Sequence, residues 1–312
     1  MQNNSVKNNI STSVIDLQSF NSEKIYSLFE SSLQLKNADT KLRSAHKNVG
    51  LGMLVFFEPS TRTRFSFEAA CARAGIYPMV LDGGSGTSLE KGETMEDTIL
   101  NLEAMRPLFF VIRCPDELNL QNLSTQIKTP IINAGWGKLG HPTQALLDSL
   151  TLFEKWGQLK NKNILFVGDI RHSRVVSSHL ELGKILNYNI GYSAPQELLP
   201  VQPSIQVQLF PKLQEGLKWA DAVVILRVQK ERHQFGQSDF SVESYRKSHG
   251  VNTEVLKNFK ADGMILHPGP INYGVELEKE VLTDLRSVIL KLVENGVFVR
   301  EILIRRALGE FL

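Results

Sequence analysis

Residues 52–74 of this 312-residue chain read GMLVFFEPSTRTRFSFEAACARA. The first of them, Gly52–Phe57, form a short and continuously apolar run, which is typical of a strand buried on both faces of a parallel sheet. A proline and a group of hydroxyl residues come next, the usual signal for a helix start, and Arg64–Ala74 has a helical pattern. The stretch therefore predicts a buried strand, a short loop and a helix.

The same succession recurs along the chain. Helical patterns such as Thr94–Met105, Thr143–Trp156 and Arg174–Leu186 alternate with further apolar runs that predict strands. These runs are Pro78–Leu81, Leu108–Ile112, Pro130–Asn133, Asn163–Val167, Ala222–Leu226 and Gly263–Leu266. Alternating strands and helices indicate the α/β class.

A polar segment, WGQLKNKN at Trp156–Asn163, precedes a fresh strand and marks the expected domain boundary. Two domains also fit the length, because one domain takes about 150 residues on average. We therefore expect two doubly wound domains, each a parallel sheet flanked by helices, with the active site in the cleft between them. The last segment, Asp284–Phe311, is a helical pattern interrupted by Gly296, and it either completes the second domain or crosses back onto the first.

The composition excludes several classes of protein. Hydrophobic residues make up 42% and charged residues 22%, as in globular proteins, and no apolar run is long enough to span a bilayer. The polar start lacks the apolar core of a secretory signal, and two cysteines are too few for a disulfide framework, so we expect a cytoplasmic protein. A net charge of +2, from 35 basic and 33 acidic residues, implies neither a nucleic acid nor a membrane as partner.

The loop after the first strand has the chemistry of an anion site. Ligands of open parallel sheets bind beyond the carboxyl ends of the strands, where Ser60, Thr61, Arg62 and Thr63 lie. A helix start offers free N–H groups and the positive end of the helix dipole, to which these residues add hydroxyl donors and a guanidinium fork. The alternative is an ordinary helix cap, but so many such residues in succession favour a phosphate site. The Gly-x4-Gly-Lys pattern of a P-loop is absent.

Two further strand ends in the first half carry polar candidates. Arg113 ends one apolar run and can reach the same crevice or form a surface ion pair, and the neighbouring Cys114 is expected to be a small semi-buried side chain rather than a nucleophile. His141 precedes Pro-Thr-Gln at a helix start, where a histidine can polarise a carbonyl oxygen. The positive end of that helix disfavours its protonated form.

The second half repeats the arrangement. Arg174 follows one strand, but the Gly-x-Gly-x-x-Gly spacing of a dinucleotide site is missing there. Arg227 follows another strand, and His267-Pro268-Gly269-Pro270 follows the last, where two prolines stiffen a loop that offers fixed backbone carbonyls.

The glycine-rich segment at residues 82–93 is expected to be mobile. It carries Ser88 and Lys91, which suit a lid that closes on an anion, and the alternative is a disordered surface loop.

Four motifs in this order, Ser60–Arg64, His141–Gln144, Arg227–Gln229 and His267–Pro270, resemble the aspartate/ornithine carbamoyltransferase family. The resemblance extends from about residue 14 to 310. Arg-Val-Gln-x-Glu-Arg and His-Pro-x-Pro resemble the aspartate branch, whereas the ornithine branch typically has His-Cys-Leu-Pro at the last loop. Two positions depart: Tyr273 stands where bacterial members often have arginine, and Cys114 where some have histidine.

The resemblance implies transfer of the carbamoyl group of carbamoyl phosphate to the amine of L-aspartate, giving N-carbamoyl-L-aspartate and phosphate in pyrimidine biosynthesis. It implies a carbamoyl phosphate-binding domain at 1–155, completed by the C-terminal helix at about 286–312, and an aspartate-binding domain at 156–285. It also implies a homotrimer with shared sites and allows a regulatory chain or a dihydroorotase as partner. No cofactor or metal is implied, and none of the clusters has metal-ligand spacing.

The resemblance also assigns roles to residues. The phosphate is held by Ser60, Thr61, Arg62, Thr63 and Arg113, and the carbonyl is polarised by Thr63, Arg113 and His141. The carbamoyl NH2 is fixed by Gln144 and the backbone at Gly269 and Pro270. The carboxylates of aspartate are gripped by Arg174, Arg227 and Gln229, with Lys91. Ser88 and Lys91 match residues that reach the neighbouring subunit's site.

Three alternatives remain at this point. The first is carbamoyl transfer to ornithine, whose ammonium group Arg227 would repel, and the second is transfer to an acylated ornithine. The third is a protein of this fold that only binds or scaffolds, although a scaffold needs no phosphate cradle. A product assay with aspartate and with ornithine separates these readings.

Overall fold

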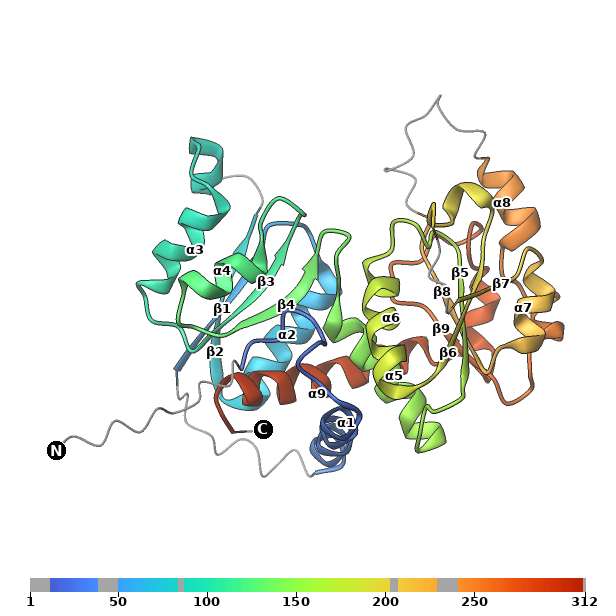
Figure 1. Ribbon diagram of the computed structural model, residues 1–312, viewed down its shortest axis with the longest axis horizontal. Coiled ribbons are helices and arrows are strands. Elements are labelled where there is room, and N and C mark those ends of the chain that lie inside the picture. Colours follow the sequence, from blue (N-terminus) through green and yellow to red (C-terminus); the bar gives the residue numbers. More distant parts are fainter. Residues whose placement is uncertain (1–11, 39–49, 84–86, 203–206, 229–240, 311–312) are drawn as a thin grey trace.

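The computed structural model describes residues 12–38, 50–83, 87–202, 207–228 and 241–310 (Figure 1). The α-helices are α1 (Ser22–Asn37), α2 (Thr61–Ala74), α3 (Met95–Glu103), α4 (Leu120–Gln126), α5 (Pro142–Trp156), α6 (Arg174–Leu186), α7 (Leu213–Trp219), α8 (Val242–His249) and α9 (Ile289–Ala307). The strands are β1 (Gly50–Phe56), β2 (Ile76–Asp82), β3 (Phe109–Cys114), β4 (Ile131–Trp136), β5 (Asn163–Val167), β6 (Asn189–Ser193), β7 (Val207–Leu209), β8 (Ala222–Ile225) and β9 (Met264–Leu266). Short 3-10 helices are η2 (Ser88–Lys91), η3 (Gln196–Leu198), η5 (Val255–Asn258) and η6 (Lys279–Thr283).

The first sheet has four parallel strands in the order β2-β1-β3-β4. Alternate residues of its strands face opposite sides, since strand side chains alternate. Leu54 and Phe56 pack in a cluster with residues of α1, α2 and α9, whereas Met53 and Val55 pack with residues of α3 and α4. Helices therefore cover both faces, as the apolar runs predict.

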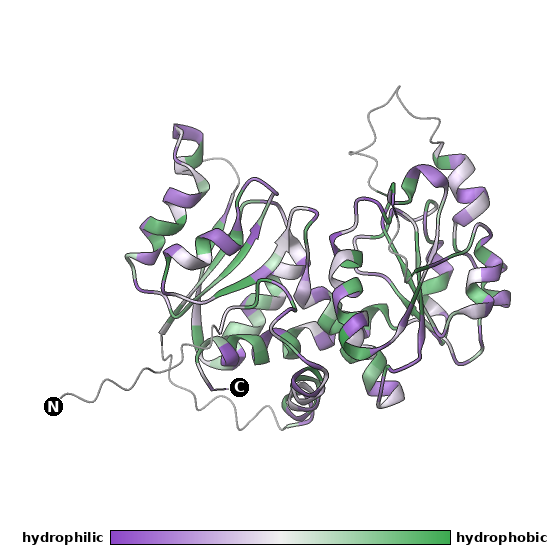
Figure 2. Ribbon diagram, viewed as in Figure 1, coloured by the Kyte–Doolittle hydropathy of each residue, from purple (hydrophilic) through white to green (hydrophobic). Residues whose placement is uncertain are grey.

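The second sheet has five parallel strands in the order β7-β6-β5-β8-β9. Ile164 and Phe166 of β5 face the side covered by α6, and Leu165 and Val167 face the side covered by α7. The expected α/β architecture of two helix-flanked parallel sheets is confirmed by this arrangement. Figure 2 shows the apolar residues concentrated on the strands and on the helix faces that meet them.

Two helices join the sheets into one body. α5 packs on α1, α6, α9 and β4, while α9 packs on α1, α2 and α5 and also touches β9 (Figure 1). One cluster of buried side chains consequently runs from Phe56 in the first sheet through Leu150 of α5 to Phe166 in the second. The C-terminal helix thus crosses back onto the first sheet.

The structure corrects the sequence-based expectations at three places. β6 and β7 had not been predicted, because Asn189–Ser193 and Val207–Leu209 are too short and polar to stand out as apolar runs. β2 is an edge strand and is not buried on both faces: Tyr77, Met79 and Val80 are exposed. Gly296 does not interrupt α9, since a Cβ there would meet Arg300 Nη1 at 2.7 Å, and the glycine serves close packing.

Among the described helices, none is long and apolar enough to cross a membrane.

Candidate active site

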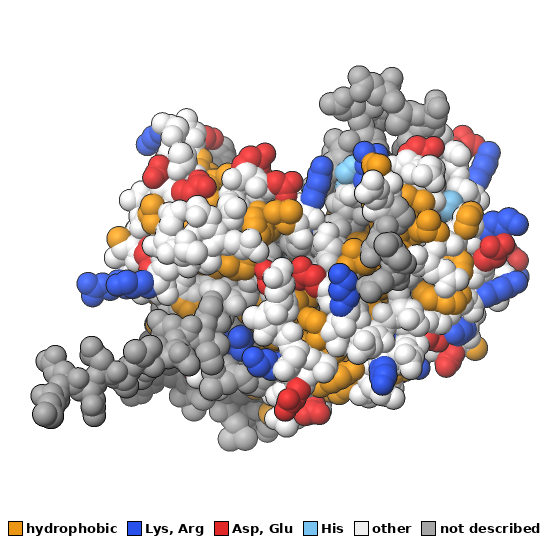
Figure 3. Space-filling view, viewed as in Figure 1, with side chains coloured by type: hydrophobic (Ala, Val, Ile, Leu, Met, Phe, Trp, Pro, Cys, Tyr) orange, Lys and Arg blue, Asp and Glu red, His pale blue; other side chains and the backbone are white. Residues whose placement is uncertain are grey.

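A cleft of about 770 Å³ lies between the carboxyl ends of the two sheets. The space-filling view shows a notch between the two lobes (Figure 3). Both sheets reverse their strand order at the centre, between β1 and β3 and between β5 and β8, and loops that leave such a reversal point diverge and open a crevice. The cleft is therefore where this topology places a ligand.

The start of α2 forms one wall. Ser60 has extended backbone, and its hydroxyl makes no capping bond to the helix. It accepts instead a hydrogen bond from Arg113 Nη1 at 3.1 Å. The two are neighbours because Phe56 and Arg113 pair in adjacent strands β1 and β3. The N–H groups at the helix start are consequently left for a ligand, as the sequence predicts for an anion site.

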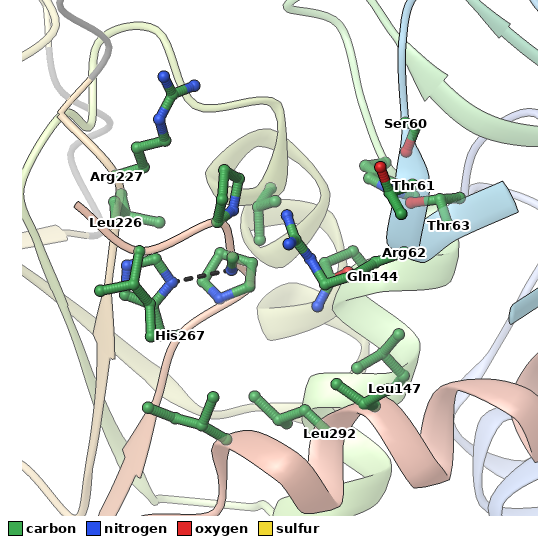
Figure 4. Close-up of a pocket in the computed structure, with 18 of the residues that line it drawn as sticks. Ser60, Thr61, Arg62, Thr63, Gln144, Leu147, Leu226, Arg227, His267 and Leu292 are labelled. Atoms are coloured by element: carbon green, nitrogen blue, oxygen red, sulfur yellow. Dashed lines mark hydrogen bonds between the residues drawn. The ribbon is translucent and has the colours of Figure 1, made fainter. Parts of the chain in front are cut away.

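Arg62 extends from this helix start into the cleft (Figure 4). Burial lowers the pKa of its guanidinium, and the positive charge of Arg227 lowers it further. Gly269 of the opposite lobe lies so close that a Cβ there would meet Arg62 Nε at 2.7 Å, and its φ of +71° also favours glycine. Arg62 and Arg227, which come from different lobes, therefore line the same cleft, and their two positive charges favour the binding of an anion there.

His141 lies at the start of α5 and is buried. Its pKa lies well below the usual range, first because it is buried and then because Arg174, Arg300 and Arg113 are close. Its ring Nδ1 is 3.4 Å from Thr143 Oγ1, and its backbone N–H donates to Ser178 Oγ at 2.8 Å. The imidazole is therefore neutral and fixed, and a neutral imidazole can donate one hydrogen bond to a carbonyl oxygen.

Gln144 follows one turn later and also lines the cleft. Its amide nitrogen donates to Asp148 Oδ1 at 2.9 Å, deep in the molecule. The amide thus has one end anchored in the interior and one end free for the cleft.

Arg174 comes from the second lobe at the start of α6, and Arg227 follows β8 of the same lobe (Figure 4 labels Arg227). Arg174 Nη1 donates to Glu58 Oε2 at 2.8 Å, and the same oxygen lies 3.5 Å from Arg113 Nε. Glu58 thus bridges the two lobes through arginines. Gln229, the third residue expected to contact aspartate, lies outside the described residues.

The loop after β9 closes the floor of the cleft. His267 Nδ1 accepts the Gly269 N–H at 2.8 Å, so the ring proton is on Nε2, which lies 3.4 Å from Glu276 Oε1. Both side chains are fully buried. This pair fixes the backbone at Gly269 and Pro270, both of which line the cleft.

Cations dominate the lining of the cleft. A single carboxylate, Asp169, lies among its described lining residues, together with six side chains that carry positive charge. These are Arg62, Arg113, Arg174, Arg227, Lys291 and Arg300. The near-neutral chain thus concentrates positive charge at one place, and the cleft suits ligands with several negative charges.

Two sequence-predicted site residues, Ser88 and Lys91, do not line the cleft; they lie on η2, exposed, beyond the edge strand β2. Cys114, which we expected to be a small semi-buried side chain rather than a nucleophile, is fully buried in the first lobe, where burial raises the pKa of its thiol. That environment does not produce the thiolate that a nucleophile needs.

The first matching family profile, aspartate/ornithine carbamoyltransferase, carbamoyl-P binding domain, covers residues 12–154. The second, aspartate/ornithine carbamoyltransferase, Asp/Orn binding domain, covers residues 160–305. The chain belongs to the aspartate/ornithine carbamoyltransferase family.

Relatives within this family are similar over most of their length. The aspartate carbamoyltransferase catalytic subunit of Thermus aquaticus is 44% identical over 79% of this chain and 80% of its own. That of Chlorobaculum tepidum is 42% identical over 82% of this chain and 85% of its own. The crystal structure of aspartate transcarbamoylase from Trypanosoma cruzi with carbamoyl aspartate and phosphate superposes with a TM-score of 0.82, at 27% identity, over 96% of this chain and 95% of its own.

Sequence reasoning missed three residues of this carbamoyltransferase site. Glu58 was read only as part of a loop, although it joins Arg113 to Arg174. Arg300 lies in the terminal helix, far along the chain, and only folding brings it to the cleft. Asp148 follows Gln144 by one helical turn, so the i, i+4 spacing was the available signal.

Proposed function

We propose that this chain transfers the carbamoyl group of carbamoyl phosphate to the amine of L-aspartate, the reaction that supplies N-carbamoyl-L-aspartate to pyrimidine biosynthesis. The observation that carries the proposal is the meeting of Arg62 and Arg113 from one lobe with Arg174 and Arg227 from the other. Carbamoyl phosphate and aspartate are both anions, and bringing them together requires such a set of cations. The names of the relatives from Thermus aquaticus and Chlorobaculum tepidum support the same acceptor.

Carbamoyl phosphate is assigned to the first lobe, whose domain we place at 1–155 with the C-terminal helix from about 286. Its phosphate takes the backbone N–H groups and hydroxyls of Ser60, Thr61 and Thr63 and the guanidinium groups of Arg62 and Arg113. Its carbonyl oxygen takes hydrogen bonds from Thr63, Arg113 and neutral His141.

The carbamoyl NH2 is assigned to the Gln144 carbonyl oxygen and to the backbone at Gly269 and Pro270. Aspartate takes the second domain, at 156–285, with its carboxylates on Arg174, Arg227 and Gln229. Each arginine offers a planar fork that matches a carboxylate.

The reaction needs no nucleophilic side chain. The amine of aspartate attacks the carbonyl carbon, so negative charge develops on an oxygen that already faces three donors. The new C–N bond forms, the C–O bond to phosphate breaks, and the leaving phosphate accepts the proton of the amine. A pH–rate profile that requires an enzyme base would contradict this last step.

One assay tests the acceptor. Purified protein is given carbamoyl phosphate with aspartate, ornithine or N-acetylornithine, and the ureido product is measured by colour. Product with aspartate alone supports the proposal. Absence of product with aspartate would overturn it, and product only with an ornithine would select the alternative acceptor.

We also propose a cytoplasmic homotrimer with shared sites. The edge strand β2 exposes Tyr77, Met79 and Val80, and Phe65 of α2 is exposed nearby in the first lobe, which together offer apolar surface for a neighbouring subunit. Ser88 and Lys91 follow β2 directly and do not line this chain's own cleft, so they are free to complete another. A regulatory chain or a dihydroorotase would bind to this trimer as an additional partner.

Subunit mixing tests the shared site. Arg62→Ala and Lys91→Ala chains, each inactive alone, are unfolded, mixed and refolded together. If each site takes Arg62 from one subunit and Lys91 from its neighbour, about one quarter of the sites in randomly mixed trimers contain both native residues. About one quarter of wild-type activity should therefore return. A mixture as inactive as its parents, or a solution mass that differs from three times 35.1 kDa, would contradict the trimer.

A further inference from the structure

A buried polar chain runs from the cleft into the second lobe. Gln144 Nε2 donates to Asp148 Oδ1 at 2.9 Å, and Asp148 Oδ2 lies 3.3 Å from His179 Nε2. His179 Nδ1 in turn lies 2.8 Å from the Tyr188 hydroxyl. Asp148 and His179 have no exposed surface, and Gln144 is exposed by only 8%. Asp148, His179 and Tyr188, all buried, therefore form a chain of side chains behind Gln144, which lines the cleft.

The chemistry of Asp148 fixes the direction of the Gln144 amide. An ionised carboxylate only accepts hydrogen bonds, whereas the two ends of an amide differ, one donating and one accepting. Gln144 must therefore turn its NH2 group toward Asp148, and its carbonyl oxygen is left for the cleft. This direction follows from the donor and acceptor chemistry of the two side chains.

His179 keeps Asp148 in place from the other lobe. It lies on α6, directly after Ser178, whose hydroxyl accepts the His141 backbone N–H at 2.8 Å. Arg174, at the start of the same helix, reaches the cleft. One helix of the second lobe thus supports both His141 and Gln144 on the first turns of α5.

We propose that Asp148, held by His179, is a positioning residue that makes Gln144 present an acceptor to the cleft and thereby selects an NH2-bearing acyl phosphate over one with a methyl group. The inference rests on the proposed function, in which Gln144 faces the carbamoyl NH2. Acetyl phosphate is the matched probe, because it differs from carbamoyl phosphate only by a methyl group in place of NH2.

Asp148→Asn tests the proposal by reversing the amide. In this variant the oxygen of the substituted side chain accepts from His179, so its NH2 faces Gln144, and Gln144 must turn its own NH2 into the cleft. Calorimetric Kd values are measured for carbamoyl phosphate, acetyl phosphate and inorganic phosphate. The hydrogen bond to Gln144 is expected to contribute about tenfold to the preference of the wild type for carbamoyl over acetyl phosphate, the worth of one well-placed hydrogen bond. Asp148→Asn should remove that contribution, leave the part that comes from the Gly269 and Pro270 backbone, and keep the Kd of inorganic phosphate within about twofold.

Two variants complete the design. Gln144→Ala should lose the tenfold contribution as Asp148→Asn does, and His179→Gln, which retains a donor toward Asp148, should keep it. If Asp148→Asn keeps the preference while Gln144→Ala loses it, or if it weakens all three ligands equally, the positioning role is overturned. If wild type and Gln144→Ala show equal preferences, the assignment of Gln144 within the proposed function fails, and the inference fails with it.

A measurement on the wild type does not depend on the folding of any Asp148 variant. The side-chain NH2 protons of Gln144, identified by their absence from Gln144→Ala, should exchange slowly with solvent by NMR because they face a buried carboxylate. Their exchange should stay slow when inorganic phosphate is added. Fast exchange in the free protein would overturn the proposal.

Discussion

The two walls of the cleft share one arrangement, although we propose that they bind different anions. In each, the key residues leave the two central strands at the point where the strand order reverses, β1 and β3 in one lobe and β5 and β8 in the other. The first wall concentrates four contiguous residues, Ser60–Thr63, at one helix start, where N–H groups, hydroxyls and a guanidinium converge. The second wall takes Arg174 from the start of α6 and Arg227 from the loop after β8.

The difference follows from the shapes of the two ligands. A phosphate is compact and accepts hydrogen bonds from many directions, so a single helix start suits it. Two carboxylates on one small molecule are apart from each other, so separate guanidinium forks suit them. Residues of the first wall should therefore govern the chemical step, and residues of the second the affinity for the acceptor.

The largest effect is expected from the first wall. Arg62→Ala should lower kcat/KM for carbamoyl phosphate about 1000-fold, because it removes a cation that lines the cleft from a site where charge moves in the transition state. Steady-state kinetics with varied carbamoyl phosphate measures it. Arg106→Ala, an exposed arginine of the same lobe, serves as the control and should match the wild type. Near-native turnover of Arg62→Ala would show that the phosphate lies elsewhere.

The second wall should respond differently to the loss of one arginine. Arg227→Leu should raise KM for aspartate about 100-fold and leave KM for carbamoyl phosphate within about threefold, because one charge-assisted fork to a carboxylate is lost. Varying each substrate in turn separates the two constants. An equal rise in both would erase the distinction between the walls.

A smaller effect is expected from Glu276→Gln. The change removes the charge that pairs with His267 behind the Gly269–Pro270 backbone, while the volume stays the same. The loop should lose part of its fixed geometry, and kcat/KM should fall about tenfold. If kinetics were unchanged, the β9 loop would not need this pair for its shape.

The smallest effect on catalysis is expected at His249, at the end of α8 and away from the cleft. Burial lowers its pKa from 6.5 to about 4. As pH falls below 6.5, the unfolded chain takes up the proton first, so stability is full above that value and decreases toward pH 4. The loss is about 3 kcal/mol at most.

Thermal unfolding at several pH values measures this dependence. His249→Gln should make stability less dependent on pH between 6.5 and 4, while buried His141 and His267, whose pKa values are also lowered, keep part of the dependence, and it should leave activity at pH 8 close to that of the wild type. A variant with the same acid sensitivity as the wild type would place the cause in other groups.

Some elements of the fold could be predicted from the sequence more readily than others. Buried central strands such as Asn163–Val167 are easily recognised, because both of their faces are apolar and nearly every residue contributes to the apolar run. Edge strands do not: Val207–Leu209 pairs on one side only and needs little apolar surface. The prediction that β2 would be fully buried was wrong for the same reason, since an edge can be left for another contact.

The site was readable wherever its residues follow a strand directly. Ser60–Thr63 were predicted as an anion site from that position. Arg113, Arg174 and Arg227 were noted there too, although their roles came from the family resemblance, and the structure brings all of them to one cleft. Glu58, Asp148 and Arg300 were missed because each acts through a partner that is distant in sequence or hidden in the core. The sequence pattern indicates the chemistry that a side chain can provide, whereas only the fold shows which neighbouring residues hold that side chain in position.

The position of α9 bears on how the protein is made. The first lobe is built from the start of the chain, yet one side of its core is completed by Ile289–Ala307, which packs on α1 and α2. A ribosome releases that helix only after the whole second lobe has been synthesised. The apolar surface of the first lobe consequently stays uncovered until the last residues emerge, whereas the second sheet already has all its strands. Premature termination within the final twenty or so residues should therefore damage the part of the enzyme that was synthesised first.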